Sequence, residues 1–199
     1  MNDRKAAIYK SAKEVFEKKG FRDSGVAEIM ERAGMATGTF YNYYPSKDTL
    51  FMQIFSDENV KLKNRLLAQI DTDADPISVM REVMIKNRQG MLENPILREW
   101  YNRDVFQKIE RNFREENHIE QVDFLYDRFI VLIEKWQRER KLRSDISAGM
   151  IMALFGAVIS VEMHKEEIGL QFFPQLIMYM VEFIMKGLME GAGDASAAP

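Results

Sequence analysis

The chain has 199 residues, of which 46% are hydrophobic and 30% are charged, and its net charge is −3. A chain of this length buries roughly 70% of its unfolded surface, enough for a core without cross-links. Its 11 Gly and 5 Pro exclude collagen-like and low-complexity proteins. Cys is absent and His118 and His164 are the only histidines, which excludes disulfides, thiolate chemistry and a three-histidine metal site within one chain.

The sequence carries no sign of export or membrane insertion. Its first residues are charged too often for a signal peptide. The longest apolar run, 149–161, falls short of the ~20 residues that a membrane helix needs. We therefore expect a cytoplasmic protein with no membrane partner. Residues 1–50 carry a net charge of +2 and the remainder −5, which weakly favours an N-terminal segment that tolerates a polyanion.

Apolar residues recur every three to four positions, without sustained alternation, which predicts an all-α fold. Gly20, Gly34 and Gly169 are expected to end helices, Pro45 to end another, and Ser46 to cap the helix that follows. The helices are predicted at 4–19, 26–33, 37–44, 46–70, 76–93, 96–116, 118–141, from a cap at Asp145 or Ser147 to 167, and 172–190.

The most informative segment is residues 20–51. Two short predicted helices joined by a turn at Gly34, with a longer helix before them, are typical of a helix-turn-helix, whose second helix enters the DNA major groove. The second helix is expected to turn Phe40 and Tyr44 inward and short polar groups outward, those of Thr37, Thr39 and Asn42. An ordinary three-helix packing unit is the alternative.

The run AGMATGTFYNYYPSKDTLF, residues 33–51, resembles the DNA-binding domain of the TetR family of transcriptional repressors. The shared features are a Gly turn, a Gly-Thr-aromatic-Tyr recognition helix and a Pro-Ser-Lys step into a long helix. The resemblance covers residues 4–55. It implies an all-helical, Ω-shaped homodimer with a variable ligand domain, phosphate contacts from Tyr43 and Lys47, and a groove-facing set of Thr37, Gly38, Thr39 and Asn42.

Three positions depart from the family pattern. Gly25 stands where Ser or Thr is common, so Ser24 is expected to take over the helix cap or a phosphate contact. Ala36 replaces a common capping Ser, and Thr37 stands where Lys is frequent. The resemblance therefore does not define the operator sequence. The domains are predicted as a helix-turn-helix domain at 1–47, a ligand-binding and dimerisation domain at 48–190, and a disordered tail at 191–199.

Two patterns imitate metal sites. Asp71, Asp73, Asp75 and Glu82 have the spacing of EF-hand ligands, but Pro76 occupies the position that needs a sharply turned Gly. A solvated linker is the favoured interpretation.

Glu115 and His118 form one ExxH pair, whereas a di-iron bundle needs two such pairs and two further carboxylates. No GxSxG, P-loop or GxGxxG motif stands between a strand and a helix. We therefore expect no metal, no cofactor and no enzymatic activity.

The last two predicted helices are apolar almost all round. A monomer of this size hardly buries both, which favours a dimer interface built from two helices of each subunit. A purely internal core is the alternative. The residues expected at the interface are a stripe of small side chains and the apolar side chains of the partner helix, namely Gly149, Ala153, Gly156, Ala157, Ser160, Ile177, Met180 and Ile184.

The helices predicted between residues 76 and 141 are rich in methionine and aromatic residues. These side chains either fill the core or line an apolar effector cavity. Asn87 shares a face with methionines, so its amide needs a partner, which is protein or ligand. The residues expected in the cavity are Met80, Met84, Asn87, Met91, Trp100, Phe113, Tyr126 and Phe129.

Together these features predict a homodimeric transcriptional regulator that binds a palindromic DNA operator. We expect a repressor that a small lipophilic effector releases. The alternative is an all-helical dimeric module that binds a protein or a lipid and has no sequence-specific affinity for DNA.

Overall fold

The computed structural model describes residues 3–102, 104–105 and 119–190. Regular structure in these ranges is helical throughout, so the predicted all-α class is confirmed. The contacts divide the chain into two compact units. The first comprises Met1–Arg65 and Asn87–Gln121, and therefore extends past the predicted boundary at residue 47. The second comprises Leu66–Lys86 and the chain from Val122 onward.

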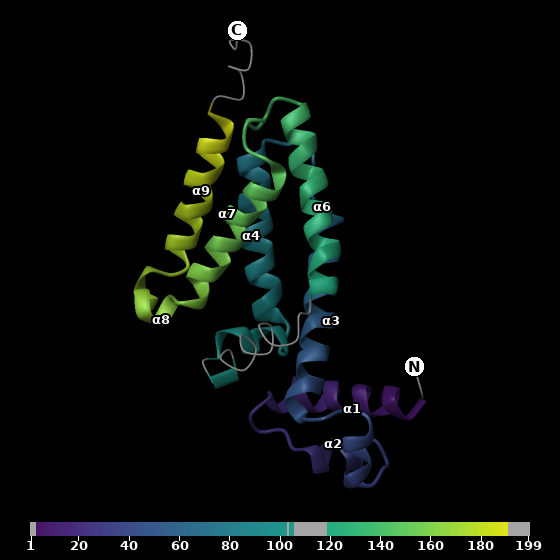
Figure 1. The fold of residues 1–199 in the computed structure, drawn as a ribbon. Coiled ribbons are helices and arrows are strands. Elements are labelled where there is room, and N and C mark those ends of the chain that lie inside the picture. Colours follow the sequence, from purple (N-terminus) through teal and green to yellow (C-terminus); the bar gives the residue numbers. More distant parts are fainter. Residues whose placement is uncertain (1–2, 103, 106–118, 191–199) are drawn as a thin grey trace. The chain divides into compact units, whose positions relative to one another are not determined.

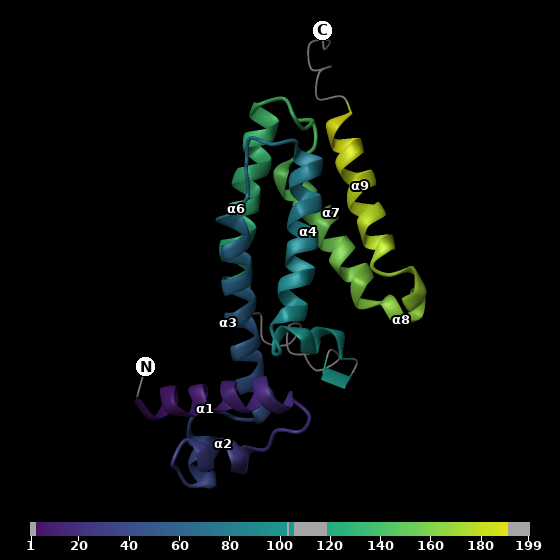
Figure 2. The same ribbon diagram turned by 180° about the vertical axis from the view of Figure 1, so that it is seen from behind.

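The first unit is built on α1 (Asp3–Lys19), α2 (Val26–Arg32), a 3-10 helix η1 (Thr37–Asn42) and most of α3 (Lys47–Leu67). α1 lies across the beginning of α3, and α2 lies beyond it (Figures 1 and 2). Gly20, at φ 76°, ends α1, and Gly34, at φ 69°, forms the turn after α2. Glycine adopts this left-handed geometry without steric cost, so these predicted ends are confirmed.

The expected helix at 37–44 is shorter and more tightly wound than predicted. The amides of Thr39 and Tyr43 donate to carbonyls three residues earlier, which defines η1 as a 3-10 helix ending at Asn42. Ala36 offers no side-chain cap to this segment, and 3-10 geometry is used mostly in short helical pieces of this kind. Ser46 caps α3 as predicted, since its Oγ accepts the Thr49 amide at 3.0 Å.

An aromatic cluster fills the core of the first unit. Phe51 packs edge-on against Phe16 at 5.2 Å between ring centroids and against Phe21 at 4.8 Å. Edge-to-face and tilted ring pairs add to the stabilisation that apolar burial alone provides. This cluster joins α1, the loop after it and α3.

The segment after α4 (Pro76–Glu93) differs from the predicted helix at 96–116. It begins as the 3-10 helix η2 (Leu97–Tyr101), and at Asn102 the backbone leaves helical geometry, with ψ 114°. The Asn94 side chain accepts the amides of Ile96 and Leu97, which satisfies the donors of a tight turn. Most of the remaining predicted helix, residues 106–116, lies outside the described residues.

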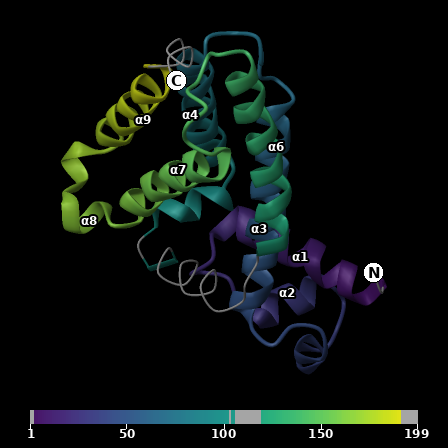
Figure 3. The ribbon, with the colours of Figure 1, turned by 45° about the horizontal axis from the view of Figure 1, so that its top comes forward.

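The second unit contains α6 (Ile119–Arg138), α7 (Ala148–Met163) and α9 (Gln175–Met189) around one core. α7 and α9 lie side by side, and α8 (Lys165–Ile168) and η3 (Leu170–Phe172) join them at one end (Figures 1 and 3). Ser147 caps α7, accepting the Met150 amide at 3.2 Å. The helix predicted to reach residue 167 stops at Met163 because the backbone at His164 turns out of helical geometry.

The acidic linker between α3 and α4 is bound to α6. The Lys135 ammonium donates to Asp73 at 2.6 Å, and a hydrogen bond from Lys135 lowers the pKa of the Asp73 carboxyl. Asp75 accepts the Ser78 amide and so caps α4. These acids contact a cation and a helix end. Over the described ranges, no three potential metal ligands cluster, and no helix has the length and apolarity that crossing a bilayer requires.

Trp136 provides a test of this core. It is buried, and its indole Nε1 donates to the Thr72 carbonyl at 3.1 Å. We expect Trp136→Phe to lower the free energy of unfolding by about 1–3 kcal/mol, because the carbonyl loses its donor and the smaller ring leaves space. Urea unfolding measures the loss. Val131→Ala, at an exposed site on α6, is the control, and an equal loss in both variants would contradict the assignment.

Candidate nucleic-acid interface

η1 presents a polar surface on an apolar anchor. Phe40 is 0% exposed and Tyr44 is also buried, as the sequence predicts. Thr37 and Asn42 are exposed and Thr39 is half-buried. Gly38 is exposed as well, and a Cβ there would meet nothing within 4 Å, so the backbone is open to close approach. Short hydroxyl and amide groups on a rigid exposed helix are suited to hydrogen bonding with base edges and phosphates.

Tyr41 is an exposed aromatic residue that the sequence pattern did not single out as a site residue. Its side chain is 61% exposed, although its ring touches buried Phe40 edge-on at 5.4 Å. An aromatic ring next to Asn42 adds an apolar surface that the methyl group of a thymine base can contact. The aromatic-Tyr pair in the sequence motif was the available signal, but helical periodicity alone assigns such residues to the core.

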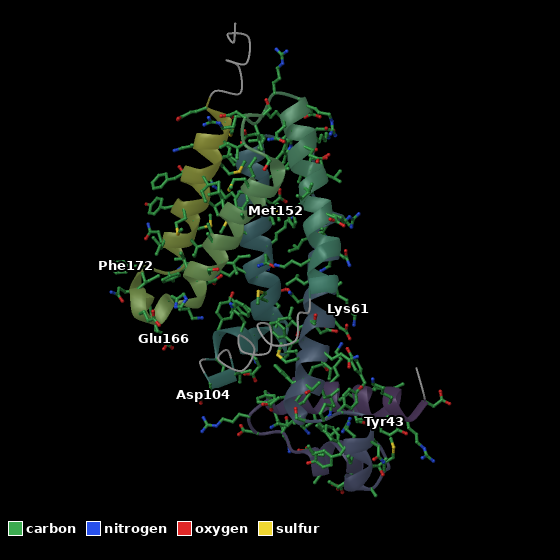
Figure 4. All side chains as sticks on the ribbon, viewed as in Figure 1. Tyr43, Lys61, Asp104, Met152, Glu166 and Phe172 are labelled. Carbon is green, nitrogen blue, oxygen red and sulfur yellow. The ribbon has the colours of Figure 1, made fainter. Side chains whose placement is uncertain are left out.

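Lys47 and Tyr43 lie at the step from η1 into α3. Lys47 Nζ donates to the carbonyls of Phe21 at 2.9 Å and Ser24 at 2.7 Å, and it lies 4.3 Å from the centroid of the Phe21 ring. The lysine that the resemblance assigns to phosphate thus also fastens the loop between α1 and α2. Tyr43, labelled in Figure 4, is half-buried.

Ser24 does not cap α2, contrary to one of its two expected roles. Its side chain is buried, and its hydroxyl donates to the Gly20 carbonyl. α2 begins after Gly25 with no side-chain cap. The carbonyl at the end of α1 needs a donor, and the hydroxyl four residues later provides it. The side chain is therefore turned away from the surface where a phosphate contact was expected.

The residues expected to line an effector cavity fall into both units. In the first unit, Lys63 donates to the Asn87 carboxamide oxygen, and the Asn87 amide nitrogen contacts the Met91 sulfur at 3.8 Å. The partner of Asn87 is therefore protein. Trp100 stacks on Phe55, with ring centroids 6.3 Å apart. Met80, Met84 and Phe129 are half-buried in the second unit, whereas Phe113 and the Tyr126 side chain lie outside what the structure describes.

A narrow crevice in the second unit lies between α4 and α9. Its lining includes Met84, Met178 and Met185, and its volume is about 10 Å³, so it is nearly filled. Arg81 and Glu182, which also line it, approach within 3.6 Å. Methionine side chains are flexible and repack easily, so this crevice can open more readily than a branched aliphatic core.

α7 and α9 carry an exposed apolar face. On α7 it follows the predicted small-residue stripe, since Ala153, Gly156, Ala157 and Ser160 are exposed and Gly149 is half-buried. Exposed Met150 and Ile159 extend it. Tyr179 and Phe183 stack with each other on the exposed side of α9, at 6.0 Å between centroids. Exposed apolar side chains gathered on neighbouring helices are typical of surfaces that associate with another molecule.

The structure changes which α9 residues can belong to that face. Ile177 is only 8% exposed and is part of the internal core, and Met180 and Ile184 pack against the same core. The inward face of α9 continues through Val181, Met185 and Leu188, at helical spacing. The predicted interface residues on α9 therefore belong to the monomer's own core.

A family model described as "Bacterial regulatory proteins, tetR family" matches residues 8–54. The chain is 31% identical over 74 residues to YdgC of Bacillus subtilis, an uncharacterized HTH-type transcriptional regulator. The aligned residues cover 36% of this chain and 38% of YdgC. It is 36% identical over 53 residues to EthR, an HTH-type transcriptional regulator of Mycolicibacterium smegmatis. The aligned residues cover 27% of this chain and 24% of EthR. The chain thus matches less than half the length of these relatives.

Solved structures resemble almost the whole chain. FadR from Bacillus subtilis, a transcriptional regulator in complex with stearoyl-CoA, is 16% identical with a TM-score of 0.58, covering 94% of this chain and 98% of FadR. SmeT, the repressor of the Stenotrophomonas maltophilia multidrug efflux pump SmeDEF, is 16% identical with a TM-score of 0.59, covering 98% and 95%. The chain therefore shares its fold with these proteins, and its residues 8–54 are similar to the N-terminal segment of the tetR family of bacterial regulatory proteins.

Proposed function

We propose that the protein is a homodimeric, DNA-binding transcriptional repressor that a small lipophilic effector releases from its operator. The observation that carries the proposal is η1, whose polar residues Thr37 and Asn42 are exposed while Phe40 anchors the helix in the core. In a helix-turn-helix, the second helix is the one that enters the major groove. η1 therefore reads bases, and Tyr41 adds to its contact surface.

A dimer accounts for the exposed apolar face of α7 and α9. Two copies of that face bury Met150, Ile159 and Phe183 against each other, and the small side chains of Ala153 and Gly156 allow the helices to approach closely. A twofold dimer carries two η1 helices related by the same twofold axis. The operator is then an inverted repeat with half-sites about one helical turn apart or slightly more.

The effector is a lipophilic molecule that enters the second unit at the methionine-lined crevice between α4 and α9. The support is the deformable lining of Met84, Met178 and Met185. The presence of stearoyl-CoA in a structural relative also supports a long apolar chain. A ligand releases DNA only if it binds the DNA-free conformation more tightly than the DNA-bound one.

The first experiment is fluorescence anisotropy with DNA fragments that flank the protein's own coding region. We expect one fragment to bind more tightly than a scrambled fragment of equal length, with an affinity that falls as salt rises. Equal affinity for both fragments would contradict the proposal and favour a module that binds a protein or a lipid.

A residue that contacts a base and a residue that contacts a DNA phosphate affect DNA affinity differently when they are replaced. Asn42→Ala should cost about 1–3 kcal/mol per base contact on the preferred site and little on mismatched DNA. Lys47→Ala should weaken binding to all sequences by one factor and also lower the melting temperature, because the loop carbonyls of Phe21 and Ser24 lose their donor. Anisotropy titrations on both DNAs provide the measurement. A common factor for both variants would remove Asn42 from base reading.

The dimer face is tested by a buried charge. Gly156→Glu should yield monomers and abolish operator binding, because an unpaired carboxylate is costly in an apolar interface. Val131→Glu places the same charge on an exposed residue of α6 and should leave the dimer intact. Sedimentation velocity reports both. An intact Gly156→Glu dimer would place the interface elsewhere.

The effector site is tested by filling the crevice. With stearoyl-CoA as the probe, ligand at a hundredfold excess over Kd should stabilise the wild type by about 2.7 kcal/mol and weaken operator binding. Met84→Trp should abolish both effects, whereas Met84→Leu, which nearly conserves volume, should retain them. Equal stabilisation of wild type and Met84→Trp in a thermal melt would show that the probe binds at another place.

A further inference from the structure

Glu58 is a buried carboxylate at the centre of a polar junction in the first unit. Its side chain lies on α3 and is 8% exposed. Oε1 accepts from the Lys13 ammonium of α1 at 2.8 Å and from the Lys61 ammonium of α3 at 2.8 Å. Oε2 accepts from the Asn94 amide, just after α4, at 3.0 Å. One carboxylate thus joins α1, α3 and the end of α4; Figure 4 labels Lys61 on α3.

The carboxylate stays ionised because its partners compensate for its burial. Burial alone raises the pKa of the Glu58 carboxyl, but hydrogen bonds from Lys13, Lys61 and Asn94 outweigh this effect and hold the pKa below its usual range. A buried charge whose partner is removed is strongly unfavourable, so each donor is held in position.

Asn94 is fixed at both ends of its amide. While its nitrogen donates to Glu58, its oxygen accepts the amides of Ile96 at 2.9 Å and Leu97 at 3.3 Å. The side chain therefore cannot rotate without breaking the start of η2. Because Asn94 directly follows the last residue of α4, its side chain moves with the end of that helix.

Further contacts attach this segment to the N-terminal helices. Glu99 on η2 accepts the Phe21 amide at 2.9 Å. Gly90 lies so close to α3 that a Cβ there would be 2.4 Å from a Leu62 methyl carbon. The residues from Gly90 to Glu99 and α1 therefore belong to one packed body, and α1 in turn packs on α2, which packs on η1.

We propose that Glu58 is a positioning residue for DNA reading: by bonding Lys13 and Asn94 together, it sets the orientation of α1, and with it α2 and η1, relative to the end of α4. This inference rests on the proposed function. Within the first unit, a displacement of the end of α4 reaches η1 through the bonds from Asn94 to Glu58 and from Glu58 to Lys13.

Two variants break the junction on opposite sides. Asn94→Asp retains the acceptor for Ile96 and Leu97 but replaces the donor to Glu58 by a second carboxylate. Lys13→Gln removes the ammonium on α1 without adding a charge clash. Gln89→Glu is the matched control, because Gln89 donates to the Glu93 carboxylate at 2.7 Å on the exposed side of α4. The control makes the same amide-to-carboxylate change away from the junction.

Orientation is measured with a pair of spin labels. The chain has no Cys, so the substitutions Ala27→Cys on α2 and Arg88→Cys on α4 introduce the two labelling sites. Both positions are exposed. With the labelled chain diluted in an excess of unlabelled chain, so that each dimer carries at most one labelled copy, double electron–electron resonance should give one narrow distance distribution for the wild type and for Gln89→Glu. Asn94→Asp and Lys13→Gln should broaden or shift it while the far-ultraviolet circular dichroism stays unchanged. A distribution that stays narrow and unshifted in both junction variants would overturn the proposal.

DNA binding provides the second readout. Asn94→Asp and Lys13→Gln should weaken binding to the preferred DNA by about 2- to 30-fold, the range for residues that carry coupling, with no change in salt slope because no phosphate contact is lost. Altered distances with unaltered affinity would overturn the link between Glu58 and DNA reading. Failure of the wild type to select any DNA sequence would contradict the proposed function, and the distances would still decide whether Glu58 positions α1.

Discussion

The ionised carboxylate of Glu58 is the constraint on which the arrangement of the first unit depends. It holds the ammonium of Lys13 and the amide of Asn94 within hydrogen-bond distance, in an environment where neither the charge nor its donors are easily left unpaired. The aromatic core of Phe16, Phe21 and Phe51 provides the apolar burial beside it. Apolar packing is only weakly directional, so the polar junction is what specifies one orientation among several well-packed ones.

The surface that we propose for DNA reading combines buried anchoring residues with exposed polar ones. Phe40 is held in the core so that Asn42 and Tyr41 are presented outward on a short helix. Lys47 fastens the loop that precedes α2 to the beginning of α3. A surface assembled in this way loses little conformational entropy on binding, because its side chains are short and its backbone is already ordered.

Helix positions could be predicted wherever a local signal specifies them. Gly20, Gly34 and Ser46 define helix ends through their own backbone or side-chain chemistry, and those ends were found where the sequence places them. The sequence did not indicate that Ile177 is buried in the core of its own chain, because an all-apolar helix does not show which side meets that core and which meets a partner. The junction at Glu58 was not predicted, since two of its three donors, Lys13 and Asn94, are 45 and 36 residues away along the chain and no short motif joins them.

The central claim is that η1 reads DNA in pairs, and hydroxyl-radical footprinting of the full-length protein on its preferred fragment tests it most directly. The account predicts two protected patches of equal size, related by an inverted repeat and separated by about one helical turn. Changing a base pair at the centre of one patch should weaken protection at both, because one dimer spans them. Protection that is uniform along the fragment, or that is unaffected by the base change, would contradict sequence reading by η1.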